Sequence, residues 1–268
     1  MNKKIIFVIA AAAIAAVLVT AVFLNRSAAP AGNRSNNPGL SADAKKLEDS
    51  GDLFSASQAY KKLISEHSDS REVADWQKKL EDLNIRLLFS PAVTPNSELY
   101  VIQPGDSLDK IARQFKTTVE LIMKSNNLAT DNIFPGKKIK IWVTPFSIVV
   151  DKSQNTLFLK CNEEVFKTYS VSTGANNSTP VGTFRITEKI LNPPWYKPSG
   201  GFAPAGSPEN ILGTRWLGLD KEGYGIHGTT DPQSLGKQAT AGCVRMLNAE
   251  VEQLYSIVPQ GTEVTIVD

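Results

Sequence analysis

Cysteine and histidine are both scarce in this chain, which has two of each among its 268 residues. Two cysteines exclude a disulfide-dense scaffold and a zinc site with four cysteine ligands. The two histidines, His67 and His227, leave little material for a histidine-rich metal site. We therefore expect neither a metal ion nor a cofactor in this protein.

A basic excess is also missing once the N-terminus is set aside. The formal net charge is +2, from 29 basic and 27 acidic residues. Lys3, Lys4 and Arg26 lie in the first 26 residues, which contain no acidic residue, so the remainder has 26 basic against 27 acidic residues. Because nucleic-acid binders normally carry a basic excess, we expect no nucleic acid among the partners.

Residues 5–24 form a run of 20 residues without a charge, in which Thr20 is the only polar side chain. At about 1.5 Å rise per residue, a helix of this length spans about 30 Å, the hydrocarbon thickness of a bilayer. Lys3 and Lys4 precede the run, so the positive-inside rule predicts a cytoplasmic N-terminus. The sequence thus predicts that residues 1–26 anchor the chain in the cytoplasmic membrane.

A cleaved signal peptide is the alternative interpretation of this N-terminus. Its apolar region is normally about 7–15 residues long, and the run here is longer. The best small-residue cleavage site, at residues 27–29, is followed by Pro30, which is unfavourable after a cleavage point. Both interpretations place the rest of the chain outside the cytoplasm, in a bacterial cell envelope.

Two segments of contrasting composition follow. Residues 27–41 contain almost no large apolar side chain and are predicted to be a flexible linker. Residues 42–90 contain no proline and one glycine and are predicted to be a helical spacer. Part of the spacer, KKLEDSGDLFSASQAYKKL, resembles half of a tetratricopeptide repeat with Gly51 at its turn. No second copy follows and a solenoid needs about three, so a lone spacer is favoured over a peptide-binding array.

Residues 99–144 have the pattern of a small β-α-α-β unit. A short strand at 99–102 precedes a helix whose apolar residues, from Leu108 to Phe115, follow 3- and 4-residue steps. A second helix begins after Thr117 or Thr118. The last segment alternates apolar and polar residues, as a strand does.

The residues YVIQPGDSLDKIARQF, LIMKSNNL and IFPGKKIKI of this unit closely resemble a LysM domain. The resemblance implies binding of peptidoglycan or chitin glycans that contain N-acetylglucosamine. It places the glycan groove between two loops, which are formed by Gly105, Asp106 and Ser107 and by the stretch from Asn132 to Gly136, with Asn132 and Ile133 as its candidate contacts. The alternative for Asp106 and Ser107 is that they only cap a helix.

Residues 146–268 are predicted to be mainly β, with strands at 147–150, 156–160, 165–174 and 182–186 that are rich in β-branched and aromatic side chains. Cys161 falls in a predicted hairpin turn, where we expect a partly exposed thiol. Asn248 is expected to cap a helix near the C-terminus. The proline- and glycine-rich stretch 193–210 is predicted to be irregular, as functional loops often are.

One segment of this region, 224–246, contains both a histidine and a cysteine, His227 and Cys243. Gly225 and Gly228 flank the histidine, and glycine allows the backbone to adopt tight conformations. A thiol with a pKa near about 8.5 is only a few per cent thiolate at pH 7, and an imidazolium neighbour that lowers this pKa to about 7 makes about half of it reactive. From residue types alone, the alternative is a buried thiol and a turn histidine.

Three further groups near Cys243 are candidates for the same chemistry. The backbone N–H groups of Gly242 and Cys243 are placed to stabilise an oxyanion. Arg245 is expected either to hold a substrate carboxylate or to pack structurally. Trp216 and Tyr224 are expected to line a substrate cleft or to pack in the core.

The motifs STG, TPVGTFRI, PWYKPSG, NILGTRWLGL, YGIHGT and GCVRM occur in this order and together strongly resemble an L,D-transpeptidase catalytic domain. The resemblance implies a mainly-β fold and a peptidoglycan substrate. It implies that Cys243 attacks the bond between the third residue and the terminal D-alanine of a tetrapeptide stem, forming a thioester that an amine resolves. His227 is then the base and later the acid, oriented by the backbone carbonyl of Gly228.

One position departs from the family pattern. Many relatives have Ser-His-Gly-Cys, whereas this chain has Thr240-Ala241-Gly242-Cys243. Thr240 keeps the hydroxyl group, but Ala241 removes a second imidazole, so the rate or the choice of acceptor is expected to differ.

The sequence as a whole predicts a multidomain protein: a transmembrane helix, a tetratricopeptide-like helical spacer, a LysM domain and a catalytic domain. We expect it to act on peptidoglycan stem peptides and to bind glycan strands, forming cross-links in the cell wall. The alternatives are an L,D-carboxypeptidase, in which water is the acceptor, and a non-catalytic wall-binding protein.

Overall fold

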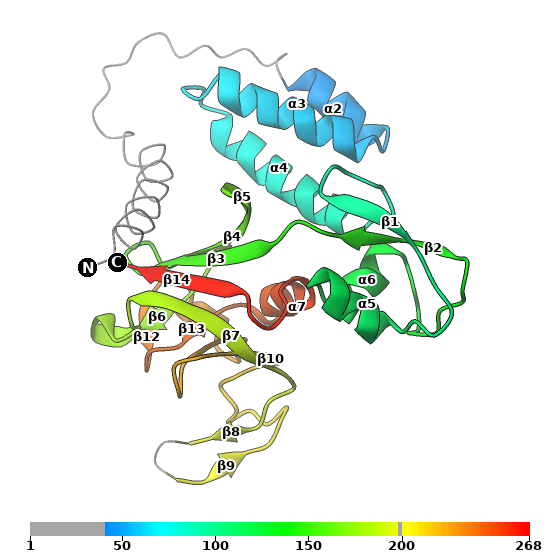
Figure 1. Cartoon of the computed structure of the whole chain (residues 1–268). Helices are drawn as coiled ribbons and strands as arrows, with labels where there is room; N and C mark the ends of the chain where they lie inside the picture. Colours follow the sequence, from blue (N-terminus) through cyan, green and yellow to red (C-terminus); the bar gives the residue numbers. More distant parts are fainter. Residues whose placement is uncertain (1–40, 198–199) are drawn as a thin grey trace, which may run out of the picture. The chain divides into compact units, whose positions relative to one another are not determined.

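The computed structural model describes residues 41–197 and 200–268, which belong to two compact units that meet between Leu83 and Asn84 (Figure 1). The predicted membrane anchor and nearly all of the predicted linker lie outside the described residues. Within the described part of the chain, no helix is both long enough and apolar enough to span a bilayer.

The first unit contains α2 (Ala42–Asp49), α3 (Leu53–Glu66) and the beginning of α4 (Val73–Leu88). The turn between α2 and α3 uses Gly51 in the left-handed conformation, and the Asp52 carboxylate caps α3 by accepting from the Ser55 N–H at 3.1 Å. The segment that resembles a tetratricopeptide repeat therefore forms a helical hairpin. The buried hydrophobic side chains of this unit are Ala44, Ala56, Tyr60, Trp76 and Leu83.

The second unit begins with the end of α4 and the LysM region. This region consists of β1 (Ser97–Val101), α5 (Leu108–Phe115), α6 (Val119–Ser125) and β2 (Lys138–Trp142), with β1 antiparallel to β2. Ser107 caps α5 and Thr118 caps α6, each by accepting a backbone N–H three residues later. The order β-α-α-β is the one that the sequence predicts.

The catalytic region is built on an eight-stranded sheet with the order β13-β11-β10-β7-β14-β3-β4-β5. Its strands are β3 (Phe146–Asp151), β4 (Thr156–Cys161), β5 (Glu164–Ser170), β7 (Gly182–Leu191), β10 (Arg215–Leu219), β11 (Gly225–His227), β13 (Val244–Arg245) and β14 (Glu263–Val267). The helix α7 (Asn248–Ile257) contacts β10 and β11.

Short elements surround this sheet. They are β6 (Thr173–Gly174) parallel to β12 (Gln238–Thr240), the hairpin of β8 (Trp195–Tyr196) and β9 (Phe202–Ala203), and single 3₁₀ turns at Ala175–Asn177 and Pro232–Ser234. The stretch predicted to be wholly irregular therefore contains a small hairpin, which projects from the sheet (Figure 1).

The structure corrects three sequence-based predictions. Cys161 is the last residue of β4 and is buried, because it alternates inward with Leu157 and Leu159. The strand predicted at 165–174 is interrupted after Ser170. The helix α7 begins at Asn248 with Leu247 as its N-cap, so the Asn248 side chain does not cap it.

One hydrophobic core joins the parts of the second unit. Ile85 and Leu88 of α4, Leu121 of α6 and Trp142 of β2 belong to the same buried cluster as the centre of the large sheet. Polar contacts support this junction, since Thr118 Oγ1 donates to the Ser256 carbonyl and Lys124 Nζ donates to Ser256 Oγ at 2.8 Å. The LysM region and the catalytic region are therefore packed together as one unit.

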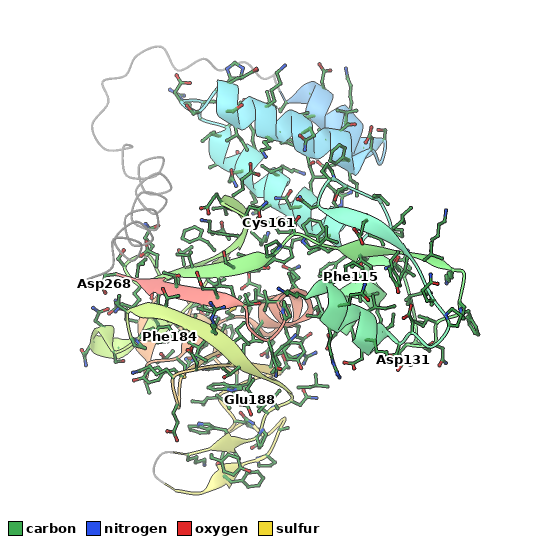
Figure 2. The ribbon with its side chains drawn as sticks, viewed as in Figure 1. Phe115, Asp131, Cys161, Phe184, Glu188 and Asp268 are labelled. Atoms are coloured by element: carbon green, nitrogen blue, oxygen red, sulfur yellow. The ribbon has the colours of Figure 1, made fainter. Side chains whose placement is uncertain are left out.

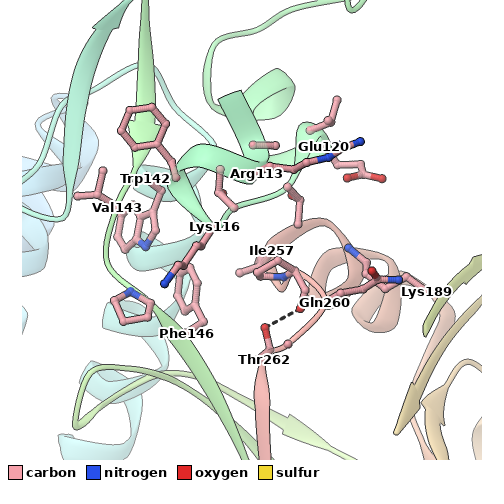
Figure 3. Close-up of a pocket in the computed structure, with 18 of the residues that line it drawn as sticks. Arg113, Lys116, Glu120, Trp142, Val143, Phe146, Lys189, Ile257, Gln260 and Thr262 are labelled. Atoms are coloured by element: carbon pink, nitrogen blue, oxygen red, sulfur yellow. Dashed lines mark hydrogen bonds between the residues drawn. The ribbon is translucent and has the colours of Figure 1, made fainter. Parts of the chain in front are cut away.

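A cleft of about 1050 Å³ lies beside this junction (Figure 3). Its walls come from α5, the end of β2, β7 and the turn before β14. Lys189 lies at its edge, where the ammonium group donates to the Tyr255 carbonyl at 2.7 Å, and burial lowers the pKa of Lys189 to about 8. Among the described residues that line this cleft, neither Cys243 nor His227 is present.

Lys140 of β2 ties the LysM region to the end of α4. Its ammonium group is 1% exposed and donates to the carbonyls of Leu87, Leu88 and Ser90 at 2.7, 3.3 and 2.8 Å. A cation at a helix C-terminus satisfies carbonyls that have no partner within the helix. Burial lowers the pKa of Lys140 to about 8, so the group is charged at neutral pH and below.

Replacing Lys140 by methionine is expected to lower the free energy of unfolding by roughly 2–4 kcal/mol, because three buried carbonyls lose their donor. Urea denaturation at pH 7 measures this loss. Lys138→Met is the matched control, since Lys138 is on the same strand and exposed. Equal losses for the two variants would contradict this role.

Candidate active site

Strand pairing brings the predicted base and the predicted nucleophile together. β11 runs parallel to β13, with Ile226 opposite Val244 and His227 opposite Arg245. Cys243 directly precedes β13, so it is level with Gly225, two residues before His227. Because side chains alternate along a strand, Cys243 and His227 lie on the same face of the sheet. The 15 residues that separate them in the sequence are bridged by this pairing.

His227 is 2% exposed, and its ring is held by its own neighbour in the chain. Nδ1 lies 2.7 Å from the Gly228 carbonyl oxygen. A carbonyl only accepts, so Nδ1 carries the proton in the neutral ring and Nε2 keeps its lone pair. Burial lowers the pKa of His227 to about 4, although the Gly228 carbonyl opposes this shift. The imidazole is therefore neutral at physiological pH, in the tautomer that a general base requires.

Cys243 is partly exposed, and its Sγ donates to the Gly223 carbonyl at 3.5 Å. Burial raises the pKa of the thiol, while a backbone hydrogen bond from Gly225 and the charge of Arg245 act in the opposite direction. The resting pair is thus favoured as neutral thiol and neutral imidazole. The sequence-based hypothesis of an imidazolium that lowers the thiol pKa does not fit this burial, because both desolvation effects disfavour charge.

The turn before Cys243 is held by the Thr240 hydroxyl group. Thr240 Oγ1 donates to the Cys243 carbonyl at 2.6 Å and accepts from the Gly242 N–H at 3.1 Å. The Gly242 N–H is predicted to stabilise an oxyanion, but it already donates to Thr240 Oγ1. The Cys243 N–H is the other predicted oxyanion donor. Ala241, where many relatives have histidine, is exposed.

Arg245 lies opposite His227 in the pairing of β11 with β13, and 9% of its surface is exposed. One guanidinium nitrogen donates to Ser234 Oγ at 2.9 Å and lies 3.9 Å from the Asp231 carboxylate. Nε is buried and has no hydrogen-bond partner. These contacts fit the structural alternative for Arg245, and its predicted role in holding a substrate carboxylate stays a prediction.

The two aromatic residues expected near the cleft both lie against the site. Tyr224 packs against the core and against Gly242, where a Cβ atom would approach Tyr224 Cε1 to 2.8 Å. Trp216 lies beside the His227 ring, with ring centroids 5.9 Å apart and planes inclined by 23°. Neither residue is only a core residue.

The structure also joins the two loops predicted to form the LysM groove. The Gly136 N–H donates to the Ile102 carbonyl and the Ile102 N–H donates to the Lys137 carbonyl, at 2.8 and 3.0 Å. Ile102 directly precedes the first loop, so the loops are adjacent. Phe134, within the predicted stretch from Asn132 to Gly136, is 71% exposed.

The individual residues of these loops differ in what they contact. Ser107 caps α5, as its structural alternative states, whereas Asp106 does not cap the helix and instead accepts from the Tyr100 hydroxyl group and the Gln103 N–H. Ile133 packs partly against the LysM core. Gly105 and Asn132 are exposed, and they are the members of the predicted set that are open to a ligand.

Asn248 is a residue of the site that sequence reasoning assigned to another role. Its Oδ1 accepts from the N–H groups of Thr214 and Thr229 at 3.2 and 3.0 Å, and its Nδ2 donates to the Thr229 carbonyl at 2.9 Å. It thereby fixes the backbone that follows Gly228. Its partners lie 19 and 34 residues away in the chain, so no local signal identifies this role.

Comparison with known proteins gives two family matches. Residues 145–266 match the L,D-transpeptidase catalytic domain and residues 100–142 match the LysM domain. Two Bacillus subtilis (strain 168) relatives are named "Putative L,D-transpeptidase YkuD" and "Putative L,D-transpeptidase YqjB". The first is 36% identical over 62% of this chain and 97% of its own length, and the second is 42% identical over 45% and 70%. Among solved structures, an L,D-transpeptidase from Mycobacterium smegmatis is 18% identical, with a TM-score of 0.40 over 50% of this chain and 64% of that chain.

Proposed function

Because this chain belongs to the L,D-transpeptidase family and also carries a LysM domain, we propose that it cross-links peptidoglycan by acyl transfer through Cys243. The observation that carries this proposal is the pairing of β11 with β13, in which the partly exposed Cys243 is level with a residue two before His227, on the same face of the sheet, while Nδ1 of His227 is held by the Gly228 carbonyl. The second family match supports a location in the cell envelope, where both domains find peptidoglycan.

In the acylation step, the thiol proton passes to His227 Nε2 and Sγ attacks the carbonyl carbon that precedes the terminal D-alanine of a tetrapeptide stem. The negative charge that develops on oxygen is stabilised by the Cys243 N–H. The carbon–nitrogen bond then breaks, and His227 returns its proton to the leaving amine. D-alanine departs and a thioester remains on Cys243.

In the second step, a side-chain amine of another stem attacks the thioester carbon. His227 Nε2 takes a proton from this amine, the carbon–sulfur bond breaks as the new amide bond forms, and the leaving sulfur of Cys243 receives the proton from His227. The thiol is regained, so the enzyme completes its cycle. We assign to Arg245 the role of a positive charge close to Cys243 that attracts a carboxylate of the donor stem.

We assign glycan binding to the LysM loops, with Gly105, Asn132 and the exposed Phe134 facing the sugar chain. Binding one part of a polymer raises the local concentration of the rest, because the second encounter is intramolecular. The proposed membrane anchor at residues 5–24 has a related effect, because it keeps the enzyme within a limited distance of the membrane.

Incubation of the purified protein with tetrapeptide muropeptides tests the function. We expect release of D-alanine, a thioester adduct on a Cys243 peptide, and dimeric products in the mass spectrum. Tripeptide monomers in place of dimers would show the L,D-carboxypeptidase reaction. The absence of both adduct and D-alanine, with the protein retained on insoluble peptidoglycan, would instead indicate the non-catalytic wall-binding alternative.

A further inference from the structure

Three neighbouring strands carry a connected set of side chains that ends at His227. Trp216 Nε1 donates to Glu188 Oε2 at 3.2 Å, and the indole ring lies along the imidazole of His227. Glu188 is on β7, Trp216 on β10 and His227 on β11, and these strands are adjacent in the sheet. Figure 2 labels Glu188 on β7.

Two glycines make room for the indole ring. Gly218 and Gly225 are paired across β10 and β11. A Cβ atom at Gly218 would lie 2.8 Å from Trp216 Nε1, and one at Gly225 would lie 2.7 Å from Cζ2 and Cη2 of the same ring. Neither glycine has a positive φ, so the backbone does not require glycine at these positions. The indole ring of Trp216 occupies the space that these glycines leave. It lies between Glu188 and β11, the strand that carries His227.

The contact with Trp216 supplements the single hydrogen bond that orients His227. The bond from Nδ1 to the Gly228 carbonyl fixes one edge of the ring, and the indole covers one face. The six-membered part of the indole lies against Gly225, which is level with Cys243 in the pairing of β11 with β13. A base held at both an edge and a face keeps Nε2 aimed at the thiol.

We propose that Trp216 is a positioning residue for the base His227, and that Glu188 fixes the orientation of Trp216 through its indole N–H. This inference rests on the proposed pairing of His227 with Cys243. Trp216 and Glu188 take no part in proton transfer; they restrict the imidazole to the orientation in which Nε2 reaches the thiol. A misplacement of about 1 Å in such a group can cost about 10²-fold in rate.

The test combines steady-state kinetics with a titration of His227 that needs no substrate. Only two histidines are present, so the ring signals of His227 and His67 are readily separated by NMR, and His67 is an internal reference. The charged and titratable groups near His227 are Arg245 and Cys243 on the β13 side, Asp231 beyond Arg245, and Glu188 on the β7 side.

We expect Glu188→Ala to lower kcat about 5- to 10-fold with little change in KM, because one hydrogen bond is lost. Glu188→Gln retains an acceptor oxygen and is expected to stay within about 2-fold of the wild type. Glu163→Ala is the control, since Glu163 is an exposed glutamate in the β4–β5 turn. In a Trp216→Phe background, which lacks the N–H, Glu188→Ala is expected to add no further loss.

Trp216→Leu is expected to lower kcat by about 10²-fold and to raise the pKa of His227 from about 4 towards 6.5, because water reaches the uncovered face. If this variant does not fold, Trp216→Phe, which keeps an aromatic ring on the imidazole, is compared with Glu188→Ala instead. Their kcat values are expected to agree within about 2-fold.

Additive losses in the double variant, or equal losses for Glu188→Ala and Glu188→Gln, would overturn the role of the hydrogen bond. An unchanged His227 titration in folded Trp216→Leu would overturn the positioning role of the ring. These outcomes are separate from failure of the proposed function, in which the wild type itself releases no D-alanine while the titration still reports on Trp216.

Discussion

Replacing Cys243 by alanine is expected to reduce D-alanine release by at least about 10³-fold, to the background of the assay, because no other side chain can form the acyl-enzyme. The fold is expected to persist, since the hydrogen bond that Cys243 Sγ donates is long, at 3.5 Å, and the side chain is partly exposed. The measurements are D-alanine release and intact mass after incubation with a tetrapeptide donor.

The second cysteine gives a matched control for this variant. Cys161 lies in the buried cluster at the centre of the sheet, and it forms no disulfide with Cys243. Cys161→Ala is expected to lower the free energy of unfolding by roughly 1 kcal/mol, through a small cavity, and to keep full activity below its melting temperature. Activity that survives in Cys243→Ala and is lost in Cys161→Ala would refute our assignment of the nucleophile.

Replacing His227 by glutamine is expected to lower the acylation rate by about 10²- to 10⁴-fold, the usual contribution of a general base. Glutamine is of similar length and its amide group can donate to the Gly228 carbonyl, so the effect isolates proton transfer. In the wild type, the rate is expected to rise with pH through about 4, where His227 loses its proton. The pH dependence of the His227→Gln rate is expected to lack this rise.

The same substitution also changes how stability depends on pH. The pKa of His227 is about 4 in the folded protein and about 6.5 when the chain unfolds, so the unfolded state binds the proton first as the pH falls. The wild type is therefore expected to lose stability between pH 6.5 and 4, by about 3 kcal/mol from this group. No such contribution arises above pH 6.5, where the ring is neutral in both states.

Urea denaturation of wild type and His227→Gln at pH 7 and pH 4 measures this difference, because contributions from carboxyl groups are shared by both proteins. Lys140 and Lys189, with pKa values near 8, are charged at both of these pH values and do not interfere. Parallel stability curves for the two proteins would contradict a neutral, buried His227.

Local signals in the sequence determine much of the LysM region. Ser107 and Thr118 cap the helices, because a hydroxyl group at this position satisfies a free backbone N–H. Apolar steps of three and four residues then fix the buried faces of α5 and α6. These effects act within one or two helical turns, so they are visible without a tertiary structure.

The errors in prediction arise where distant segments compete with local preferences. Asn248 is a good capping residue by type, but its side chain binds the backbone of Thr214 and Thr229 instead. Cys161 follows a strand and precedes turn residues, yet it is buried because β4 extends through it. In both cases a partner far along the chain decides the outcome.

The sequence by itself identified His227 and Cys243 as the candidate reacting residues, because a histidine and a cysteine with flanking glycines resemble the motif of an L,D-transpeptidase catalytic domain. It also determined the order of the helices and strands in the LysM region. Only the tertiary structure decided the spatial arrangement and the protonation state of these two candidates. The pairing of β11 with β13 aligns the thiol with the imidazole, and burial of both groups keeps them neutral. The contact of Trp216 with His227 depends on strand register and desolvation, which arise only when segments distant in the chain pack together.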